Sequence, residues 1–153
     1  MTVQECFQSA VRIEILLRDL YAGLANCFRS DPVLHESFLG LAEEEQQHAL
    51  RIRLLALHRK GVVWTDEAIA RVGKDIVAIV AELSAMATDV AGRSDVPGAV
   101  PVLRRVIEVE RRCAALHAEG LARSADPAVR KFFSSLARQD AYHELMLEQA
   151  IQG

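Results

Sequence analysis

The sequence predicts an all-α fold, an antiparallel four-helix bundle made of two repeated helical hairpins with a long helical crossover between helices 2 and 3. Apolar residues recur every three or four positions in four separate segments, which is the period of an amphipathic helix. Aromatic residues make up only 5% of the chain and there are 4 prolines, a composition that suits helices better than a many-stranded sandwich. The 153 residues are expected to form one domain over 1–153.

The first hairpin is expected over residues 3–60. Its first helix has a stripe that is apolar except for one carboxylate and one phenol: Val3, Phe7, Ala10, Glu14, Leu17, Tyr21, Leu24 and Phe28. Asp31-Pro32 then indicates the start of a second helix, because Asp caps helix N-termini and Pro is favoured at the first helical position. The second stripe comprises Leu34, Phe38, Leu41, Glu45, His48, Ile52 and Leu55, and its helix is expected to end near Lys60-Gly61.

A helical crossover is expected over residues 62–98, followed by the second hairpin over 99–151. Thr65-Asp66-Glu67 is typical of a helix start, and the apolar positions from Ile76 to Met86 indicate that the crossover contains one or two helices before it ends at Pro97-Gly98. The stripes of the second hairpin are Leu103, Val106, Glu110, Cys113, His117 and Gly120 in the third helix, and Val129, Phe133, Leu136, Asp140, His143, Leu147 and Ala150 in the fourth.

The second hairpin repeats the pattern of the first. Asp31-Pro32 recurs 95 positions later as Asp126-Pro127. At the same offset, Phe38, Leu41, Ala42, Glu45 and His48 recur as Phe133, Leu136, Ala137, Asp140 and His143. Glu14 and Tyr21 correspond to Glu110 and His117 at an offset of 96. Because apolar, acidic and histidine positions match together, we interpret the chain as a duplicated helical hairpin.

Each stripe has one carboxylate near its middle, and two of them also have a histidine three positions further on. Residues three apart on a helix project from neighbouring points of one face. No Lys or Arg falls on the stripes, and burying isolated carboxylates costs several kcal/mol or more each. Protonation would remove the charge without explaining the histidines, whereas two divalent cations explain both. The expected metal ligands are Glu14, Glu45, His48, Glu110, Asp140 and His143.

The chemistry of these ligands favours particular metals. A set rich in carboxylate oxygen, with one imidazole for each metal, favours iron or manganese over structural zinc, which prefers Cys and His. We therefore expect two iron ions, with manganese or zinc as alternatives. One Glu from each of two helices, plus an acid-x-x-His pair from each of the other two, is the arrangement of ferritin-like dinuclear bundles.

These motifs resemble the rubrerythrin/ferritin-like di-iron carboxylate family. The resemblance covers the four bundle helices, through Ser9–Tyr21, Phe38–His48, Glu110 and Asp140-Ala141-Tyr142-His143. It implies a ferritin-like bundle in which the acids of the first and third helices are terminal ligands and those of the acid-x-x-His pairs bridge the metals. Glu14 and Glu110 would thus be terminal, Glu45 and Asp140 would be bridges, and His48 and His143 would each bind one metal.

Other positions match or depart from the family pattern. Tyr21 is either a core tyrosine or the tyrosine that in this family hydrogen-bonds a ligand carboxylate across the bundle. His117 replaces the tyrosine that the repeat predicts, and is either an interior histidine, a hydrogen-bond partner of a ligand, or an extra ligand. Asp140 is one methylene shorter than the usual Glu, and Cys113 lies about where rubrerythrins have an additional glutamate. The three cysteines lack Cys-x-x-Cys spacing, so the rubredoxin domain of rubrerythrins is not expected in these 153 residues.

The resemblance implies non-haem di-iron oxidase or peroxidase chemistry on Fe(II), O₂ or H₂O₂, with an electron donor that the sequence does not identify. The alternative is a non-catalytic metal-binding or interaction module with a zinc, manganese or vestigial site. Hydroxylation of an organic or tRNA substrate on the same fold is a third, less favoured hypothesis.

Composition and charge limit the classes of binding partner and the cellular compartment that we expect for this protein. The net charge of −3, without a basic cluster, argues against nucleic-acid binding. Three cysteines without Cys-x-x-Cys spacing indicate a reducing compartment. Glu5 and Glu14 interrupt any signal-peptide core and no apolar run reaches membrane-spanning length, so a cytoplasmic protein without a membrane partner is expected. The apolar face of residues 76–87 is expected either to cover the bundle or to form a homodimer surface.

Overall fold

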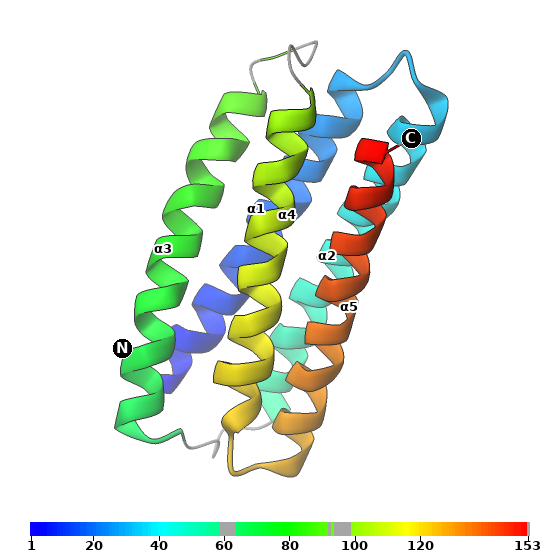
Figure 1. The fold of residues 1–153 in the computed structure, drawn as a ribbon. Coiled ribbons are helices and arrows are strands. Elements are labelled where there is room, and N and C mark those ends of the chain that lie inside the picture. The colour runs from blue at the N-terminus through cyan, green and yellow to red at the C-terminus, as the bar shows by residue number, and fades with distance from the viewer. Residues whose placement is uncertain (59–63, 92, 94–98, 153) are drawn as a thin grey trace.

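The protein is all-helical in a computed structural model that describes residues 1–58, 64–91, 93 and 99–152 (Figure 1). Five α-helices are present among these residues: α1 (Val3–Cys27), α2 (Pro32–His58), α3 (Asp66–Ala91), α4 (Ala99–Ala115) and α5 (Pro127–Gln152). A π-helix (Leu116–Gly120) and a short 3₁₀ helix (Leu121–Arg123) connect α4 to α5. No strand occurs in the described part of the chain, which confirms the predicted all-α class.

The five helices lie side by side along a common direction (Figure 1). Helix α1 packs against α2 and α3, α4 packs against α5 and α3, and α2 also contacts α5. Helix α3 returns the chain from the end of α2 to the opposite end of the molecule, so α2 and α4 run in the same direction and α1 and α5 run in the other (Figure 1). The predicted crossover therefore contains one helix. Its expected limits at Lys60-Gly61 and Pro97-Gly98 lie outside the described residues.

The helix starts follow the capping signals of the sequence. Thr2 and Glu5 form a capping box at the start of α1. Pro32 and Pro127 are the first residues of α2 and α5, as the two Asp-Pro pairs predict. The Asp31 and Asp126 carboxylates accept hydrogen bonds from backbone N–H groups of the first turns, over 3.2 and 2.8 Å. Both hairpins therefore use the same device to start their second helix.

Helix α3 closes one side of the molecule with its apolar face. It buries Val72, Ile76, Ile79, Leu83, Met86 and Val90 against α1 and the α4–π segment. Two glycines permit this close packing, because a Cβ on Gly23 would lie 2.8 Å from Val90 Cγ1 and one on Gly120 would lie 2.7 Å from Val72 Cγ2. Of the two roles expected for the 76–87 face, the structure therefore shows that of covering the bundle.

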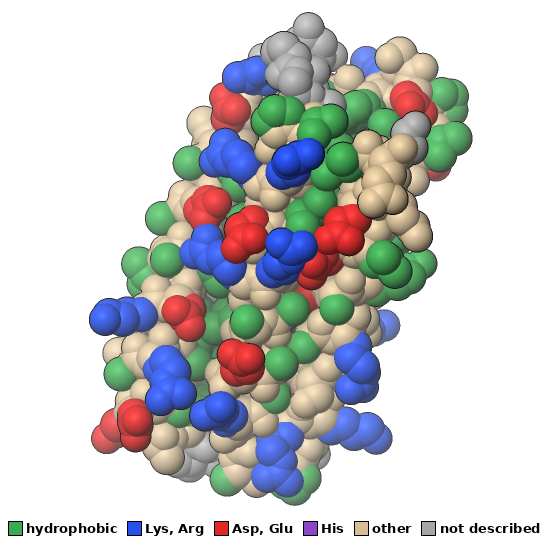
Figure 2. Space-filling model, in the orientation of Figure 1, with side chains coloured by type: hydrophobic (Ala, Val, Ile, Leu, Met, Phe, Trp, Pro, Cys, Tyr) green, Lys and Arg blue, Asp and Glu red, His purple; other side chains and the backbone are tan. Residues whose placement is uncertain are grey.

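The outer surface is charged with both signs. Figure 2 shows Lys and Arg side chains interspersed with Asp and Glu side chains over α3, α4 and α5. Arg111 of α4 forms ion pairs with Glu144 and Glu148 of α5 at 2.6 and 3.0 Å, and Arg112 pairs with Glu82 of α3. None of the described helices has the length and apolar character needed to cross a membrane.

The third helix ends earlier than its stripe predicts. The stripe was expected to continue to Gly120, but α4 ends at Ala115 and the chain continues as one π-helical turn. A π turn uses hydrogen bonds from i to i+5 and therefore inserts a residue relative to the α-helical period. A periodicity of 3.6 does not reveal this insertion in advance. The turn contains His117, which is fully buried.

We predict that alanine has opposite effects at two of the helical glycines. Gly40 is exposed in α2 with nothing within 4 Å of a Cβ, so Gly40→Ala should raise the free energy of unfolding by about 1 kcal/mol through helix propensity. Gly23→Ala should lower it, because overpacking costs about 1–3 kcal/mol and Val90 is stiff at χ1. Urea denaturation measures both, and equal stabilisation by the two substitutions would contradict the close α1–α3 packing.

Candidate metal centre

Four carboxylates and three histidines are buried together between the helices. Their residue exposures are 0% except for His48, at 3%: Glu14, Glu45, His48, Glu110, His117, Asp140 and His143. Helices α1, α2, α4 and α5 and the π turn each contribute at least one of these side chains. All six predicted ligands are thus interior residues, although each lies in a helix that presents charged side chains to solvent elsewhere. Their burial follows from their positions on the apolar stripes.

Two groups of donor atoms are close enough to hold a metal ion. One ligand atom from each of Glu14, Glu45 and His48 lies within 4.8 Å of the others, and the same holds for Glu45, Glu110 and His143. Glu45 belongs to both groups. The three-residue spacing from Glu45 to His48 brings these two side chains to one group, whereas His143 reaches the other group from α5.

Nitrogen Nδ1 is the atom that each histidine of these groups turns toward the carboxylates. His48 Nδ1 lies 3.0 Å from Glu45 Oε2 and 3.3 Å from Glu14 Oε2. His143 Nδ1 lies 2.9 Å from Glu45 Oε1 and 3.5 Å from Glu110 Oε1. The His143 contacts are short, but they do not have hydrogen-bond alignment, since both His143 Nδ1 and Glu45 Oε1 lack a hydrogen-bond partner. Ligand atoms that lie this close without hydrogen-bond alignment are better placed to bind the same metal ion than to bond to each other directly.

Unpartnered buried atoms supply a test of whether this pocket fits cations. Such atoms are rare in folded proteins because each costs about 1–3 kcal/mol. The atoms without a hydrogen-bond partner in this pocket are Glu14 Oε1, Glu45 Oε1, Glu110 Oε2, His117 Nε2, Asp140 Oδ1 and His143 Nδ1. Each can donate a lone pair to a metal when the residue is deprotonated. The donors therefore fit oxygen-preferring divalent cations.

Asp140 is placed differently from the other predicted ligands. The family resemblance implies a bridge between the metals, but Asp140 belongs to neither of the two donor groups. Its Oδ2 instead accepts a hydrogen bond from His117 Nδ1 at 2.5 Å, and its Oδ1 has no partner. The aspartate side chain is one methylene shorter than glutamate, which reduces its reach toward the shared carboxylate. The acid of the second pair is therefore not equivalent to Glu45.

Tyr21 and His117 occupy equivalent positions in the repeat and approach equivalent carboxylates. The Tyr21 hydroxyl donates a hydrogen bond to Glu110 Oε1, which joins α1 to α4. His117 Nε2 lies 3.6 Å from Glu14 Oε1, too far for a hydrogen bond. The His117 ring also stacks on Phe133, with centroids 5.8 Å apart. Tyr21 thus orients one carboxylate, whereas His117 bonds to Asp140 and faces Glu14.

Burial and mutual charge shift the pKa values of the pocket. Burial and the nearby Glu45 charge raise the pKa of Glu14 to about 7. Burial disfavours the charged form of the histidines, but their contacts with carboxylates outweigh it: Glu14 and Glu45 raise the pKa of His48 to about 10, and Glu110 and Glu45 raise that of His143 to about 12. Burial, followed by the charge of Asp140, raises the pKa of the Cys113 thiol well above its usual value. Without metal, protons therefore neutralise this pocket.

Two residues that the sequence analysis did not single out contact the histidines from outside. His143 Nε2 lies 2.5 Å from Glu44 Oε2, and His48 Nε2 contacts Gln139 Oε1. Both partners directly precede the acid of an acid-x-x-His pair. The signal that could have found them is their equivalence in the repeat, because Gln139 follows Glu44 by the same 95 positions. Glu44 and Gln139 also line a surface pocket of about 430 Å³ that includes both histidines.

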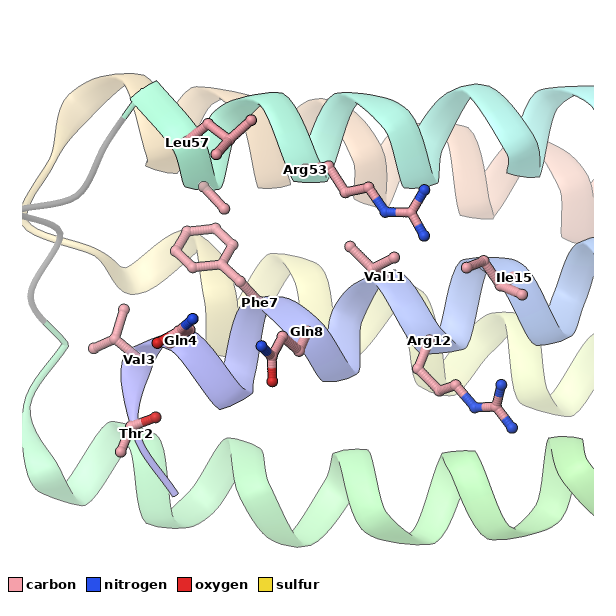
Figure 3. Close-up of a pocket in the computed structure, with 11 residues that line it drawn as sticks. Thr2, Val3, Gln4, Phe7, Gln8, Val11, Arg12, Ile15, Arg53 and Leu57 are labelled. Atoms are coloured by element: carbon pink, nitrogen blue, oxygen red, sulfur yellow. The ribbon is translucent and has the colours of Figure 1, made fainter.

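A larger groove lies away from the acidic pocket. Figure 3 shows residues from the N-terminal half of α1 and the end of α2 around a cavity of about 1060 Å³. Both apolar and polar side chains line this groove. Phe7 and Leu57 lie near one end, and Arg12 and Arg53 lie further along (Figure 3). Among the described residues that line it there is no carboxylate, histidine or cysteine. The groove therefore does not offer metal ligands.

Comparison with protein-family models, curated proteins and solved structures gives no match for this chain.

We predict that the metal-free protein loses stability as pH rises. The folded-state pKa values of Glu14, about 7, and His48, about 10, both exceed the ordinary values of 4.5 and 6.5. The folded state therefore binds more protons than the unfolded chain, which lowers the free energy of unfolding across 4.5–7 for Glu14 and 6.5–10 for His48. Urea unfolding in chelator should show a loss of roughly 2 kcal/mol or more between about pH 5.5 and pH 9.

The control for this pH dependence is Glu14→Gln, which removes one titrating carboxyl. It should flatten the part of the profile below about pH 7. Because Glu14 also helps to raise the pKa of His48, the substitution should end the histidine part of the profile at a lower pH without removing it. Stability that is constant or increases with pH in the metal-free protein would contradict proton neutralisation of the pocket.

We predict that Tyr21→Phe destabilises the metal-free protein. The substitution removes the donor to Glu110 Oε1 and leaves a buried acceptor unsatisfied, which costs about 1–3 kcal/mol. Denaturant unfolding at neutral pH measures the loss. Tyr142→Phe is the matched control, since Tyr142 is 57% exposed and should change the free energy of unfolding little. Equal effects of the two substitutions would argue against an orienting role for Tyr21.

Proposed function

We propose that the chain is a ferritin-like, rubrerythrin-like dinuclear metal protein with non-haem di-iron oxidase or peroxidase chemistry on Fe(II), O₂ or H₂O₂. The observation that carries the proposal is the sharing of Glu45 between two groups of buried donor atoms. One carboxylate common to two adjacent sites is the ligand arrangement that a bridged pair of metals requires.

The helix arrangement supports the same proposal. Helices α1, α2, α4 and α5 each contribute side chains to the acidic pocket. Helix α3 is the long crossover between α2 and α4, which run in the same direction (Figure 1). Long crossover connections of this kind occur in ferritin-like bundles. The two hairpins α1–α2 and α4–α5 each supply one lone glutamate and one acid-x-x-His pair. We infer that the pocket evolved by duplication of a hairpin, which accounts for its approximate twofold character.

The charges and unpartnered atoms indicate which residues would hold the metals. Glu14, Glu45 and His48 would bind one ion, and Glu45, Glu110 and His143 the other. Asp140 Oδ1 and His117 Nε2 are further free donors at the edge of the pocket. Carboxylate-rich ligation with one imidazole for each ion favours iron or manganese. Metal binding would replace the protons that neutralise the pocket in the metal-free protein.

The residues around this pocket would prepare it for reaction with a small oxidant. Two iron ions, when bound, would supply the electrons that reduce O₂ or H₂O₂. The chain contributes a buried pocket that excludes bulk water, carboxylates held at fixed positions, and the Tyr21 hydroxyl that orients Glu110. Glu44 and Gln139 hold the two histidines with Nδ1 facing inward. These features favour a small inorganic oxidant over a large organic substrate.

We predict that the protein binds two Fe(II) ions under anaerobic conditions and accelerates their oxidation by O₂ or H₂O₂. Bound iron is counted by metal analysis after removal of free metal, and oxidation is followed by optical absorption. Glu45→Ala should abolish both, because it removes the ligand common to the two groups. Glu43→Ala is the control, since Glu43 lies two residues away, bonds only to Gln47 among the described contacts, and should change neither quantity.

Two results would count against this function. Failure to bind any divalent metal tightly would overturn the metal centre itself. Binding of two Fe(II) ions without faster oxidation than free Fe(II) would leave the centre and overturn the oxidase or peroxidase activity.

A non-catalytic metal-binding module is the second candidate. The observation that favours it is the bond from His117 to Asp140, which keeps the expected second bridging acid out of both donor groups. A single carboxylate bridge suits a stable zinc or manganese site as well as a reactive one. In this case the protein purified without chelators would contain zinc or manganese, and the bound metal would not change oxidation state with O₂ or H₂O₂.

A further inference from the structure

The two ligand histidines are held from outside by contacts that cross between the same two helices. His143 of α5 contacts Glu44 of α2, and His48 of α2 contacts Gln139 of α5. In each case the outer nitrogen Nε2 makes the contact, while Nδ1 faces the buried carboxylates. An N–H at Nε2 that donates to an oxygen acceptor leaves Nδ1 free to donate its lone pair to a metal.

These outer contacts are related by the internal repeat. His48 and His143 are separated by 95 positions, and Glu44 and Gln139 are separated by the same 95. Each half of the chain therefore holds the histidine of the other half with the residue before its own acid. Such a reciprocal pair would be identical in a truly symmetric protein. Here the symmetry is broken, because one acceptor is a carboxylate and the other is an amide.

The difference between a carboxylate and an amide acceptor has a direct effect on metal binding. A hydrogen bond to a charged acceptor is about twice as strong as one to a neutral acceptor. A histidine that donates its outer N–H to a carboxylate becomes a more basic ligand at its inner nitrogen. The Glu44 charge also adds to the attraction for a cation on the side of His143, although its 52% exposed side chain is partly screened by solvent.

A second observation points to the same side of the pocket. Glu110, which belongs to the group of His143, accepts a hydrogen bond from Tyr21. Glu14, which belongs to the group of His48, has the unbonded His117 Nε2 at 3.6 Å, and its hydrogen-bond contact over 3.3 Å is with His48 Nδ1, a candidate ligand atom that would turn to the metal. The carboxylate beside His143 is therefore oriented before a metal arrives, which reduces the entropy lost on binding.

We propose that Glu44 and Gln139 are positioning residues that make the two metal positions unequal, so that the position formed by Glu45, Glu110 and His143 fills before the one formed by Glu14, Glu45 and His48. This inference rests on the proposed dinuclear centre. It assigns an order to metal uptake that neither the number nor the type of the ligands requires. The position at His143 would hold its ion more tightly than the position at His48.

The order of filling can be tested with Zn(II) as a diamagnetic probe of the full chain. Stepwise titration by calorimetry measures two binding constants, and ¹⁵N NMR of labelled histidine shows which ring responds at each equivalent. Only five histidines are present, and His48→Ala and His143→Ala assign the two ligand rings. The Nε2–H and Nδ1 signals of His143 should change at the first equivalent and those of His48 at the second.

Reciprocal substitutions test the cause. Glu44→Gln makes both acceptors amides and should weaken the first binding constant about 10- to 100-fold. Gln139→Glu should strengthen the second constant, and the double variant E44Q/Q139E should make His48 respond first. Glu43→Gln is the matched control, because it removes the same charge one residue away, and the hydrogen bond described for Glu43 is with Gln47 and with neither histidine. Glu44 is half exposed and Gln139 is partly exposed, so the variants keep the buried core intact.

The outcomes separate this inference from the function on which it rests. Two bound Zn(II) ions with equal constants, or constants that Glu44→Gln changes no more than Glu43→Gln, would overturn the positioning roles while leaving the dinuclear centre in place. Failure to bind Zn(II) would overturn the inference, and failure to bind any divalent metal tightly would overturn the centre as well. An unchanged filling order in the double variant would show that Tyr21 and His117, and not the outer acceptors, set the order.

Discussion

The burial of four carboxylates among apolar helices is the constraint on which the rest of this structure depends. Ionised acids without water or counter-charge would cost more than a small domain can compensate. The pocket meets this constraint with three buried histidines and with protonated acids, as the raised pKa of Glu14 shows. This compensation is incomplete, since six buried polar atoms of the pocket remain without hydrogen bonds. That remainder makes the pocket a candidate for cations and not simply a buried polar network.

The internal repeat gives this pocket its approximate twofold character, and a few positions break it. Glu45 is shared by two donor groups, whereas its counterpart Asp140 bonds to His117. Tyr21 orients Glu110, whereas its counterpart His117 makes no hydrogen bond to Glu14. Glu44 and Gln139 hold equivalent histidines with different charge. Each difference changes the electrostatics of one half of the pocket only.

Much of the fold could be predicted because it depends on local signals. The two Asp-Pro pairs placed the starts of α2 and α5, and the apolar stripes placed Glu14, Glu45, Glu110 and Asp140 in the interior. The π turn at 116–120 could not be predicted, since no local motif marks it and the turn packs against α3 and α5, which are distant in the sequence or follow it. The departure of Asp140 from the bridging position likewise depends on the His117 ring that the π turn brings toward it.

The sequence by itself determined the all-helical class, the duplicated hairpins and the identity of the buried acids and histidines, because periodicity and capping act within a few residues of the chain. Only the tertiary structure decided which of these side chains bring their ligand atoms within reach of one ion and which nitrogen of each histidine faces inward. It also decided which residue contacts the outer nitrogen of each histidine. Those choices depend on distances between α2 and α5, whose contacting residues lie 91 and 99 positions apart. No local pattern sets such distances; the packing of all five helices does.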